Sequence, residues 1–249
     1  MTTYVLLGLF GLVGGIGITA FGPGGVLPTI GLFLLTPLAP AQVAGTAIVT
    51  HVATGALGTA AYVHSGQLRE VHTRRIAGVL AATAVVGAPV GVWLNSLVSA
   101  RLFGLLLAVF AVVVAGLVWL RDRRGTPVRP DLPAGLVVGL GLVVATAAGL
   151  VGVGGPMLTV PLLVACGVPM LEGLAAAQAQ SVVIAGAGTI GYLVHGAVDG
   201  PLALVIGLPE LAGVLLGWKL ARRMPVRRLK IVLIAALLAV APYLAFHGG

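Results

Sequence analysis

The sequence predicts an all-α polytopic membrane protein made of two inverted repeats, each with about five helical segments and with broken or short helices at glycine-rich motifs. Three observations predict this fold class. Hydrophobic residues make up 59% of the 249 residues and charged residues only 8%, which leaves too few polar groups to cover a water-soluble globule. Apolar stretches long enough to cross a bilayer recur along the chain, and the chain matches itself at one fixed offset.

A transmembrane helix needs about 20 mostly apolar residues. The segments that approach or exceed this length are 4–20, 41–63, 76–94, 102–120, 136–151, 173–194, 202–218 and 231–246. Two shorter apolar segments, 26–35 and 156–165, follow the first and the fifth of them. The first span has no Lys or Arg before it and is followed by further spans, so we expect it to stay in the mature protein.

The second half of the chain repeats the first at an offset of 130 residues without a gap. Matched pairs include Gly22 with Gly152, Gly24 with Gly154, Gly25 with Gly155, Thr29 with Thr159 and Tyr62 with Tyr192. Paired Gly, Thr and Tyr residues at one offset indicate a duplication. We therefore expect a first transmembrane repeat at 1–120, a cytoplasmic linker at 121–132 and a second transmembrane repeat at 133–249.

The basic residues predict the orientation of the chain. Thirteen of the 14 Lys and Arg residues fall in the three segments 69–75, 121–129 and 219–230, and only Arg101 lies elsewhere. Cytoplasmic loops are rich in Lys and Arg, so we place all three segments in the cytoplasm. This requires the two short segments to cross the membrane, which gives ten crossings, inverted halves and both termini outside. We expect a multi-pass protein of the inner, cytoplasmic membrane.

The glycine-rich motifs predict helix breaks that bind a ligand. We assign substrate binding to Gly22, Gly24 and Gly25 in the first half and to Gly152, Gly154 and Gly155 in the second. A break at membrane depth is tolerated only where it is buried in protein or lines a wet cavity. The new helix N-terminus offers free N–H groups and partial positive charge, which suit an anion. The alternative is that these glycines only allow close helix packing.

The span after each break is unusually polar. The polar residues assigned to substrate binding are Thr46, Thr50, His51, Gln178, Gln180 and Ser181. The offset of 130 pairs Thr50 with Gln180 and His51 with Ser181. Such neutral groups could bind an oxyanion without a full counter-charge. The alternatives are a Thr that bonds its own helix and a His51 that is simply a satisfied core residue.

Glu210 lies about midway along the span 202–218, where a carboxylate is costly. We assign proton coupling to Glu210 together with His51. The alternative is that Glu210 pairs with another group and is purely structural.

Other function classes have little support in the sequence. The single Cys166 cannot form an internal disulfide, and no Cys/His cluster has metal-ligand spacing, so we expect no metal and no cofactor. Membrane topology accounts for the basic loops better than nucleic-acid binding. No nucleophile motif or nucleotide-binding motif indicates an enzyme or a pump. A cation or metal carrier and an intramembrane enzyme remain alternatives, and a homodimer is left open.

Several motifs resemble the sulfite exporter TauE/SafE family of membrane permeases. They are the run from Gly152 to Pro161 (GVGGPMLTVP), its counterpart Gly22-Pro23-Gly24-Gly25, Ala44-Gly45-Thr46-Ala47, and the run from Tyr192 to Asp199. The resemblance covers almost the whole chain. It implies transport of a small sulfur-containing anion, such as sulfite or an organosulfonate, without a bound cofactor. The first half departs from the pattern, because Gly31 stands where Pro161 stands in the second.

Overall fold

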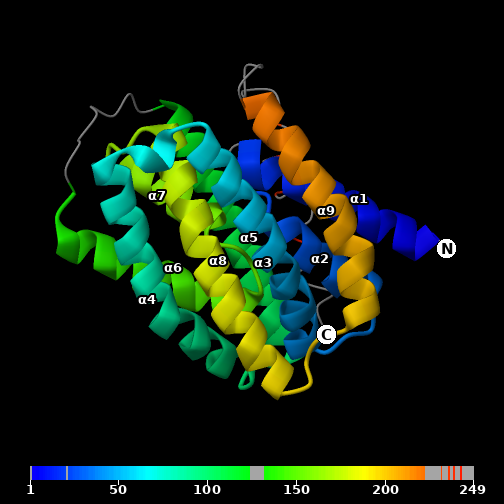
Figure 1. Cartoon of the computed structure of the whole chain (residues 1–249). Coiled ribbons are helices and arrows are strands. Elements are labelled where there is room, and N and C mark those ends of the chain that lie inside the picture. Colours follow the sequence, from blue (N-terminus) through cyan, green and yellow to red (C-terminus); the bar gives the residue numbers. More distant parts are fainter. Residues whose placement is uncertain are drawn as a thin grey trace.

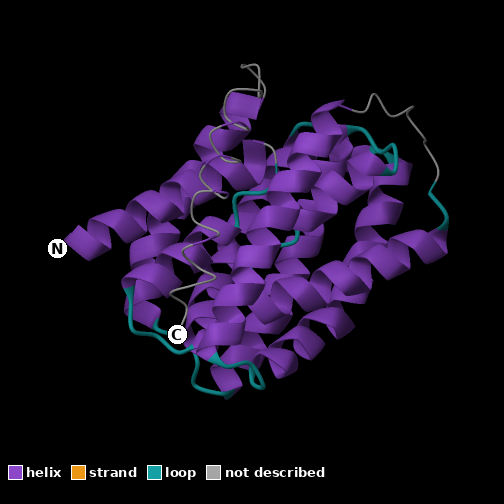
Figure 2. Ribbon diagram, turned by 180° about the vertical axis from the view of Figure 1, so that it is seen from behind, coloured by secondary structure: helices purple, strands orange, loops and turns teal. Residues whose placement is uncertain are grey.

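The computed structural model describes residues 2–20, 22–123 and 132–221, together with positions 231, 235, 238 and 242. Within this part of the chain the regular structure is helical, without a strand. The elements are α1 (Thr2–Ala20), α2 (Val26–Leu35), α3 (Pro40–His64), the short 3₁₀ helix η1 (Gln67–Arg69), α4 (Val71–Asn95), α5 (Ala100–Arg123), α6 (Ala134–Val151), α7 (Pro156–Ala165), α8 (Met170–Val194) and α9 (Gly200–Ala221). They form one bundle of helices (Figure 2), in which α8 lies between α3 and α4 (Figure 1).

Seven of the described helices are long and apolar enough to cross a membrane: α1, α3, α4, α5, α6, α8 and α9. They coincide with the first seven of the predicted long spans, so the predicted class of all-α polytopic membrane protein is confirmed. Most of the last predicted span, 231–246, and most of the predicted linker, 121–132, lie outside the described residues. Val85, Val143, Ile190 and Val194 are exposed on the bundle, as expected of side chains that contact lipid.

The short helices α2 and α7 occupy the two short apolar segments that the sequence analysis singled out. Each has 10 residues, which gives a length of about 15 Å, half of a hydrocarbon core about 30 Å thick. α2 runs back along α1, because a Cβ atom on Gly14 would lie 2.8 Å from Pro28 and one on Gly31 would lie 2.8 Å from Phe10. That these two segments cross the membrane stays a prediction, with which the return of α2 along α1 agrees.

Helices related by the offset of 130 residues make matching contacts. α1 packs along α9, and their counterparts α6 and α4 pack along each other. The Tyr62 hydroxyl donates to the Thr19 carbonyl at 2.8 Å, and the Tyr192 hydroxyl donates to the Gly149 carbonyl at 2.8 Å. Each of these bonds joins residues that are 43 apart in the sequence. The duplicated sequence has therefore produced duplicated contacts.

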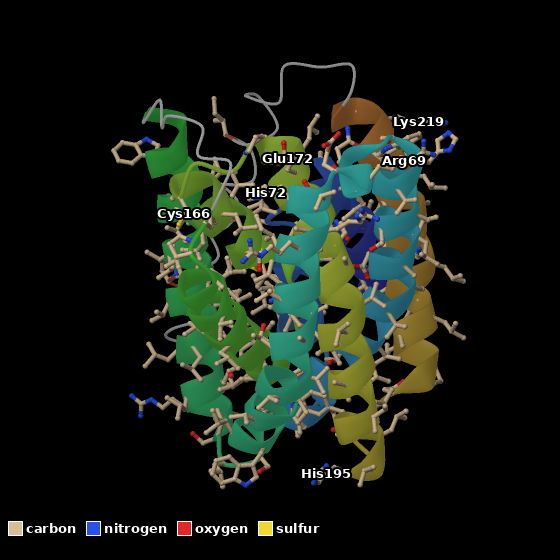
Figure 3. The ribbon with its side chains drawn as sticks, turned by 60° about the vertical axis from the view of Figure 1, so that its left-hand side comes forward. Arg69, His72, Cys166, Glu172, His195 and Lys219 are labelled. Atoms are coloured by element: carbon tan, nitrogen blue, oxygen red, sulfur yellow. The ribbon has the colours of Figure 1, made fainter. Side chains whose placement is uncertain are left out.

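α3 and its counterpart α8 run in opposite directions. Arg69, which follows α3, and Glu172, at the start of α8, lie at one end of the bundle, whereas His195, which follows α8, lies at the other (Figure 3). An inverted repeat requires this antiparallel relation. Inversion of the complete halves stays a prediction, which this arrangement supports. Lys219 lies at the same end as Arg69 (Figure 3), as expected if both face the cytoplasm.

Small residues allow α1 to approach α9 closely at the position of Glu210. A Cβ atom on Gly15 would overlap the Glu210 carbonyl group and lie 2.9 Å from the amide nitrogen of Val214. Glycine at such a crossing lets two helix backbones pack against each other within a membrane. This contact holds the segment of α9 that carries Glu210 against α1.

The Gly15→Ala substitution should lower the free energy of unfolding by about 1–3 kcal/mol, because the added methyl group cannot fit without moving α9. Thermal unfolding of the detergent-purified protein measures the effect. Gly139→Ala in α6 is the matched control, because no atom lies within 4 Å of its added Cβ. Equal melting temperatures for the two variants would show that α1 and α9 do not make this contact.

Candidate functional site

Both glycine-rich motifs interrupt a helix, as predicted. Gly22 (φ +104°) and Gly152 (φ +77°) adopt left-handed backbone conformations, which glycine enters without the penalty of a side chain. After the breaks, α2 begins at Val26 and α7 at Pro156, whose ring suits the first turn of a helix. No side chain caps either N-terminus. The Leu27 amide donates to the Gly24 carbonyl at 3.0 Å, whereas the amides of Val26, Met157 and Leu158 have no acceptor within their own helix.

The two breaks lie against each other in the interior of the bundle. A Cβ atom on Gly22 would lie 2.9 Å from the Pro156 carbonyl oxygen, and one on Gly25 would lie 3.5 Å from the Gly154 amide nitrogen. The Thr29 hydroxyl on α2 donates to the Gly152 carbonyl at 3.0 Å. The amino ends of the two short helices consequently meet at one location, which we call the central site.

α3 and α8 bring polar side chains to the central site. A Cβ atom on Gly25 would lie 3.0 Å from His51 Nε2, and one on Gly154 would lie 3.0 Å from His51 Cδ2. That Cβ atom on Gly154 would also lie 2.8 Å from Ser181 Oγ. His51 and Ser181 are 1% and 2% exposed, so this side of the site is closed to the surroundings. His51 and Ser181, which the offset of 130 residues pairs in the sequence, therefore lie close together in the structure.

Two buried nitrogen atoms at the central site have no hydrogen-bond partner: His51 Nε2 and Gln180 Nε2. The other end of the Gln180 amide is fixed, because its Oε1 atom accepts a hydrogen bond from the Thr159 hydroxyl at 2.6 Å. Buried polar groups are nearly always paired in native proteins, so unpaired ones require an explanation. A bound ligand that accepts hydrogen bonds would pair with the Gln180 amide and with a protonated His51.

Glu210 of α9 lies beside His51. The Glu210 carboxyl is fully buried, and its Oε1 atom lies 3.4 Å from His51 Nε2. His51 Nδ1 lies 2.9 Å from the Ala47 carbonyl oxygen, which only accepts, so Nδ1 carries a hydrogen. In a neutral His51 ring, Nε2 is therefore a hydrogen-bond acceptor, and so is the Oε1 atom of an ionised Glu210. The two atoms can form a hydrogen bond only when one further proton is present on His51 or on Glu210.

Thr50 provides a second indication of a proton at this position. Its hydroxyl oxygen lies 2.8 Å from the Ala47 carbonyl oxygen and 2.5 Å from Glu210 Oε2. A hydroxyl has one hydrogen to donate, so both contacts are hydrogen bonds at once only when Glu210 supplies its own proton. The geometry around Glu210 therefore accommodates an exchangeable proton next to the helix breaks.

Two predicted binding residues have structural partners instead of facing the breaks. The Thr46 hydroxyl accepts a hydrogen bond from the Asp199 amide at 2.9 Å, which ties the connection between α8 and α9 to α3. The Gln178 side chain donates to the Ile18 carbonyl at 3.3 Å and packs against Gly58. Both placements favour a bracing role, so substrate contact by these two residues stays a prediction without support here.

Sequence reasoning did not assign Thr29 and Thr159 to the site, although the offset of 130 pairs them. Thr29 bonds the Gly152 backbone and Thr159 bonds the Gln180 side chain. Both lie on the short helices that follow the breaks. Their repetition next to the glycine motifs was the signal that could have identified them.

A mainly apolar groove lies beside Thr50, and the described part of the chain holds no cluster of metal ligands. A groove of about 590 Å³ between α3 and α9 has Thr50 and Gly207 among its lining residues and is otherwise mainly apolar. Among the described residues, no group of three or more His, Cys, Asp or Glu side chains could hold a metal ion. Hydrogen-bond donors and one carboxyl group are therefore the chemistry that the centre offers.

Comparison with known proteins identifies the family. A search of the curated proteins gives no match. The family model described as sulfite exporter TauE/SafE matches residues 7–244 of the 249. The match covers nearly the whole chain, and the structure provides the apolar helices that such a protein needs. The chain is therefore a multi-pass membrane protein of the sulfite exporter TauE/SafE family, which is a family of membrane transporters and not of enzymes.

Proposed function

We propose that this protein moves a small sulfur oxyanion, such as sulfite or an organosulfonate, through the central site, and that a proton on Glu210 and His51 accompanies the anion. One observation carries the proposal: two uncapped helix N-termini meet in a buried location that also holds unpaired nitrogen atoms of His51 and Gln180. Amide N–H groups at helix N-termini bind anions, and the helix dipoles add partial positive charge.

The donors around the central site suit an anion that must be released again. They are backbone N–H groups, the Ser181 hydroxyl and the Gln180 amide, which are neutral donors, together with His51 Nε2 when a further proton resides on the ring. None of the described Lys or Arg side chains is buried. Since neutral donors bind an anion more weakly than a fixed opposite charge, they allow the anion to leave on the far side of the membrane.

Charge balance links the anion to a proton. An anion next to an ionised Glu210 would place two negative charges in a site of low dielectric constant, which is costly. A proton shared between Glu210 and His51 removes this repulsion, and the contacts of Thr50 and His51 accommodate one there. We therefore assign the coupling role to these two residues and propose that anion and proton travel together.

The structure favours an anion over the cation alternative. A cation or metal carrier needs several carboxylate, imidazole or thioether ligands around one point. Of the described acidic residues, Glu210 alone is buried, and the other polar groups at the centre present hydrogen-bond donors. We further propose that the two halves rock against each other around the central site to expose it alternately, with the basic end in the cytoplasm and both termini outside.

The first test is counterflow of radiolabelled sulfite and of a short organosulfonate in proteoliposomes. Ser181→Ala should weaken anion binding about tenfold or more, because a hydrogen bond to a charged group is lost. Gly154→Ala should have a similar effect, since its Cβ would lie 2.8 Å from Ser181 Oγ, inside the central site.

Gly186→Ala is the control for both variants, because it lies on α8 with no atom within 4 Å of the added Cβ. It should transport like the unmodified protein. The proposal would be contradicted if neither sulfite nor the organosulfonate is transported. Equal transport by Gly154→Ala and Gly186→Ala would contradict it as well.

The second test is the pH dependence of transport. With one coupled proton, anion uptake should rise by up to about tenfold for each unit that the pH falls on the side of uptake. Glu210→Gln removes the exchangeable proton and should flatten this dependence, while Glu172→Gln at the start of α8 should leave it unchanged. An unaltered pH profile in Glu210→Gln would exclude Glu210 from coupling.

A further inference from the structure

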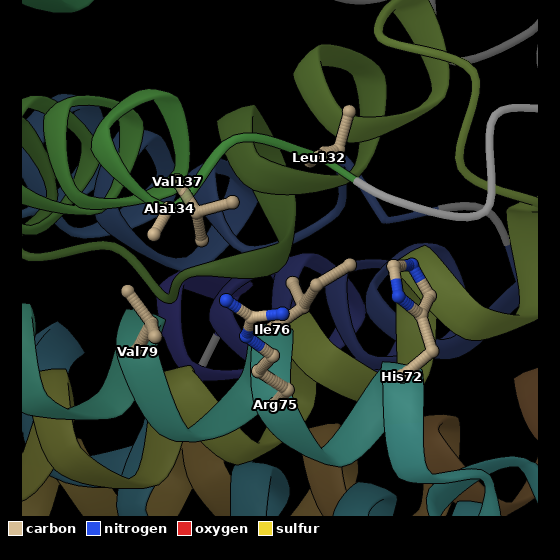
Figure 4. Close-up of a pocket in the computed structure, with 7 residues that line it drawn as sticks. All are labelled: His72, Arg75, Ile76, Val79, Leu132, Ala134 and Val137. Atoms are coloured by element: carbon tan, nitrogen blue, oxygen red, sulfur yellow. The ribbon is translucent and has the colours of Figure 1, made fainter.

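A second groove lies away from the central site, between the beginnings of α4 and α6. His72, Arg75, Ile76 and Val79 line it from α4. Leu132, Ala134 and Val137 line it from the opposite side. Figure 4 shows the His72 ring and the Arg75 guanidinium group extending from α4 toward the segment with Leu132 and Val137.

The sequence of α4 puts a charged and an apolar part on the same helix face. Residues three or four positions apart share a face, so His72, Arg75, Ile76 and Val79 form one stripe. The basic groups stand in the first turns of the helix, and the apolar ones follow deeper along it. His72 lies at the same end of the bundle as Arg69 and Lys219 (Figure 3). The stripe thus runs from the basic end of the protein toward its apolar middle.

The guanidinium group of Arg75 gives the groove a positive charge. Arg75 is exposed, and within the described part of the chain no carboxylate forms an ion pair with it. The nearby acidic residues Glu70 and Glu172 line a different pocket, and Glu172 accepts a hydrogen bond from Thr73 at 3.3 Å. No side chain caps α4 or α6, so the N–H groups of two helix N-termini add to the attraction for an anion.

We propose that this groove binds the headgroup phosphate of an anionic phospholipid. Arg75 and His72 contact the phosphate, and an acyl chain follows Ile76, Val79 and Val137 toward the membrane interior. A tetrahedral oxyanion could also come from solution, but the apolar continuation of the groove fits a lipid. Basic pockets between transmembrane helices at the cytoplasmic side are known sites for anionic headgroups.

The position of the groove gives the lipid a structural effect. α4 belongs to the first half of the chain and α6 to the second, and the two helices pack along each other. A phosphate held between their N-termini connects the halves at the membrane surface. Anionic lipid should therefore stabilise the contact between the two repeats.

Native mass spectrometry of the detergent-purified protein tests the site without any transport measurement. Phosphatidylglycerol should bind more tightly than phosphatidylcholine. Arg75→Gln should weaken phosphatidylglycerol binding about fivefold, the effect of one basic residue near an anionic membrane. Arg75→Lys keeps the charge and should retain most of the affinity, which shows that the loss does not come from misfolding.

Arg74→Gln is the matched control, since it removes the same charge from the adjacent position, whose side chain does not line the groove. It should change binding less than twofold. Equal losses in Arg74→Gln and Arg75→Gln would mean that only general surface charge attracts the lipid, and would overturn the proposal. Equal binding of the two lipids, or displacement of phosphatidylglycerol by millimolar inorganic phosphate, would overturn it as well.

Discussion

The structure depends on the need to satisfy backbone N–H groups that are removed from water. Within a membrane a helix normally provides for its own amides, and this protein interrupts that pattern twice, before Val26 and before Pro156. It brings both interruptions to one buried location, beside His51 and Ser181. Amides without helical partners are costly in such a place unless something pairs with them, which is the physical basis of the proposed anion site.

In the proposed function, the neighbouring polar residues fall into a group that contacts the anion and a group that holds the proton. Ser181 and Gln180 present donors to the breaks, whereas Thr50 and Glu210 form a separate contact on the other side of His51. His51 belongs to both groups. Because its Nδ1 atom is committed to the Ala47 carbonyl, Nε2 is the atom that can respond both to the charge of an anion and to the protonation of Glu210.

Much of the fold could be predicted from the sequence, because its signals are local or periodic. Hydropathy located the spans, and the bounds of α2 and α7 follow from the glycine motifs and Pro156. Contacts between distant segments carried no such signal. The bond between Thr50 and Glu210 joins residues 160 apart. The partners of Thr46 and Gln178 likewise depend on packing that composition does not encode.

The central claim is that the two helix breaks form one anion site. An experimental structure of the protein with selenite, an analogue of sulfite with a strong anomalous signal, tests it most directly. The account predicts selenium between the amino ends of α2 and α7, within hydrogen-bond distance of Ser181 and the Gly154 amide. Selenium bound elsewhere in a protein whose centre stays empty would contradict it.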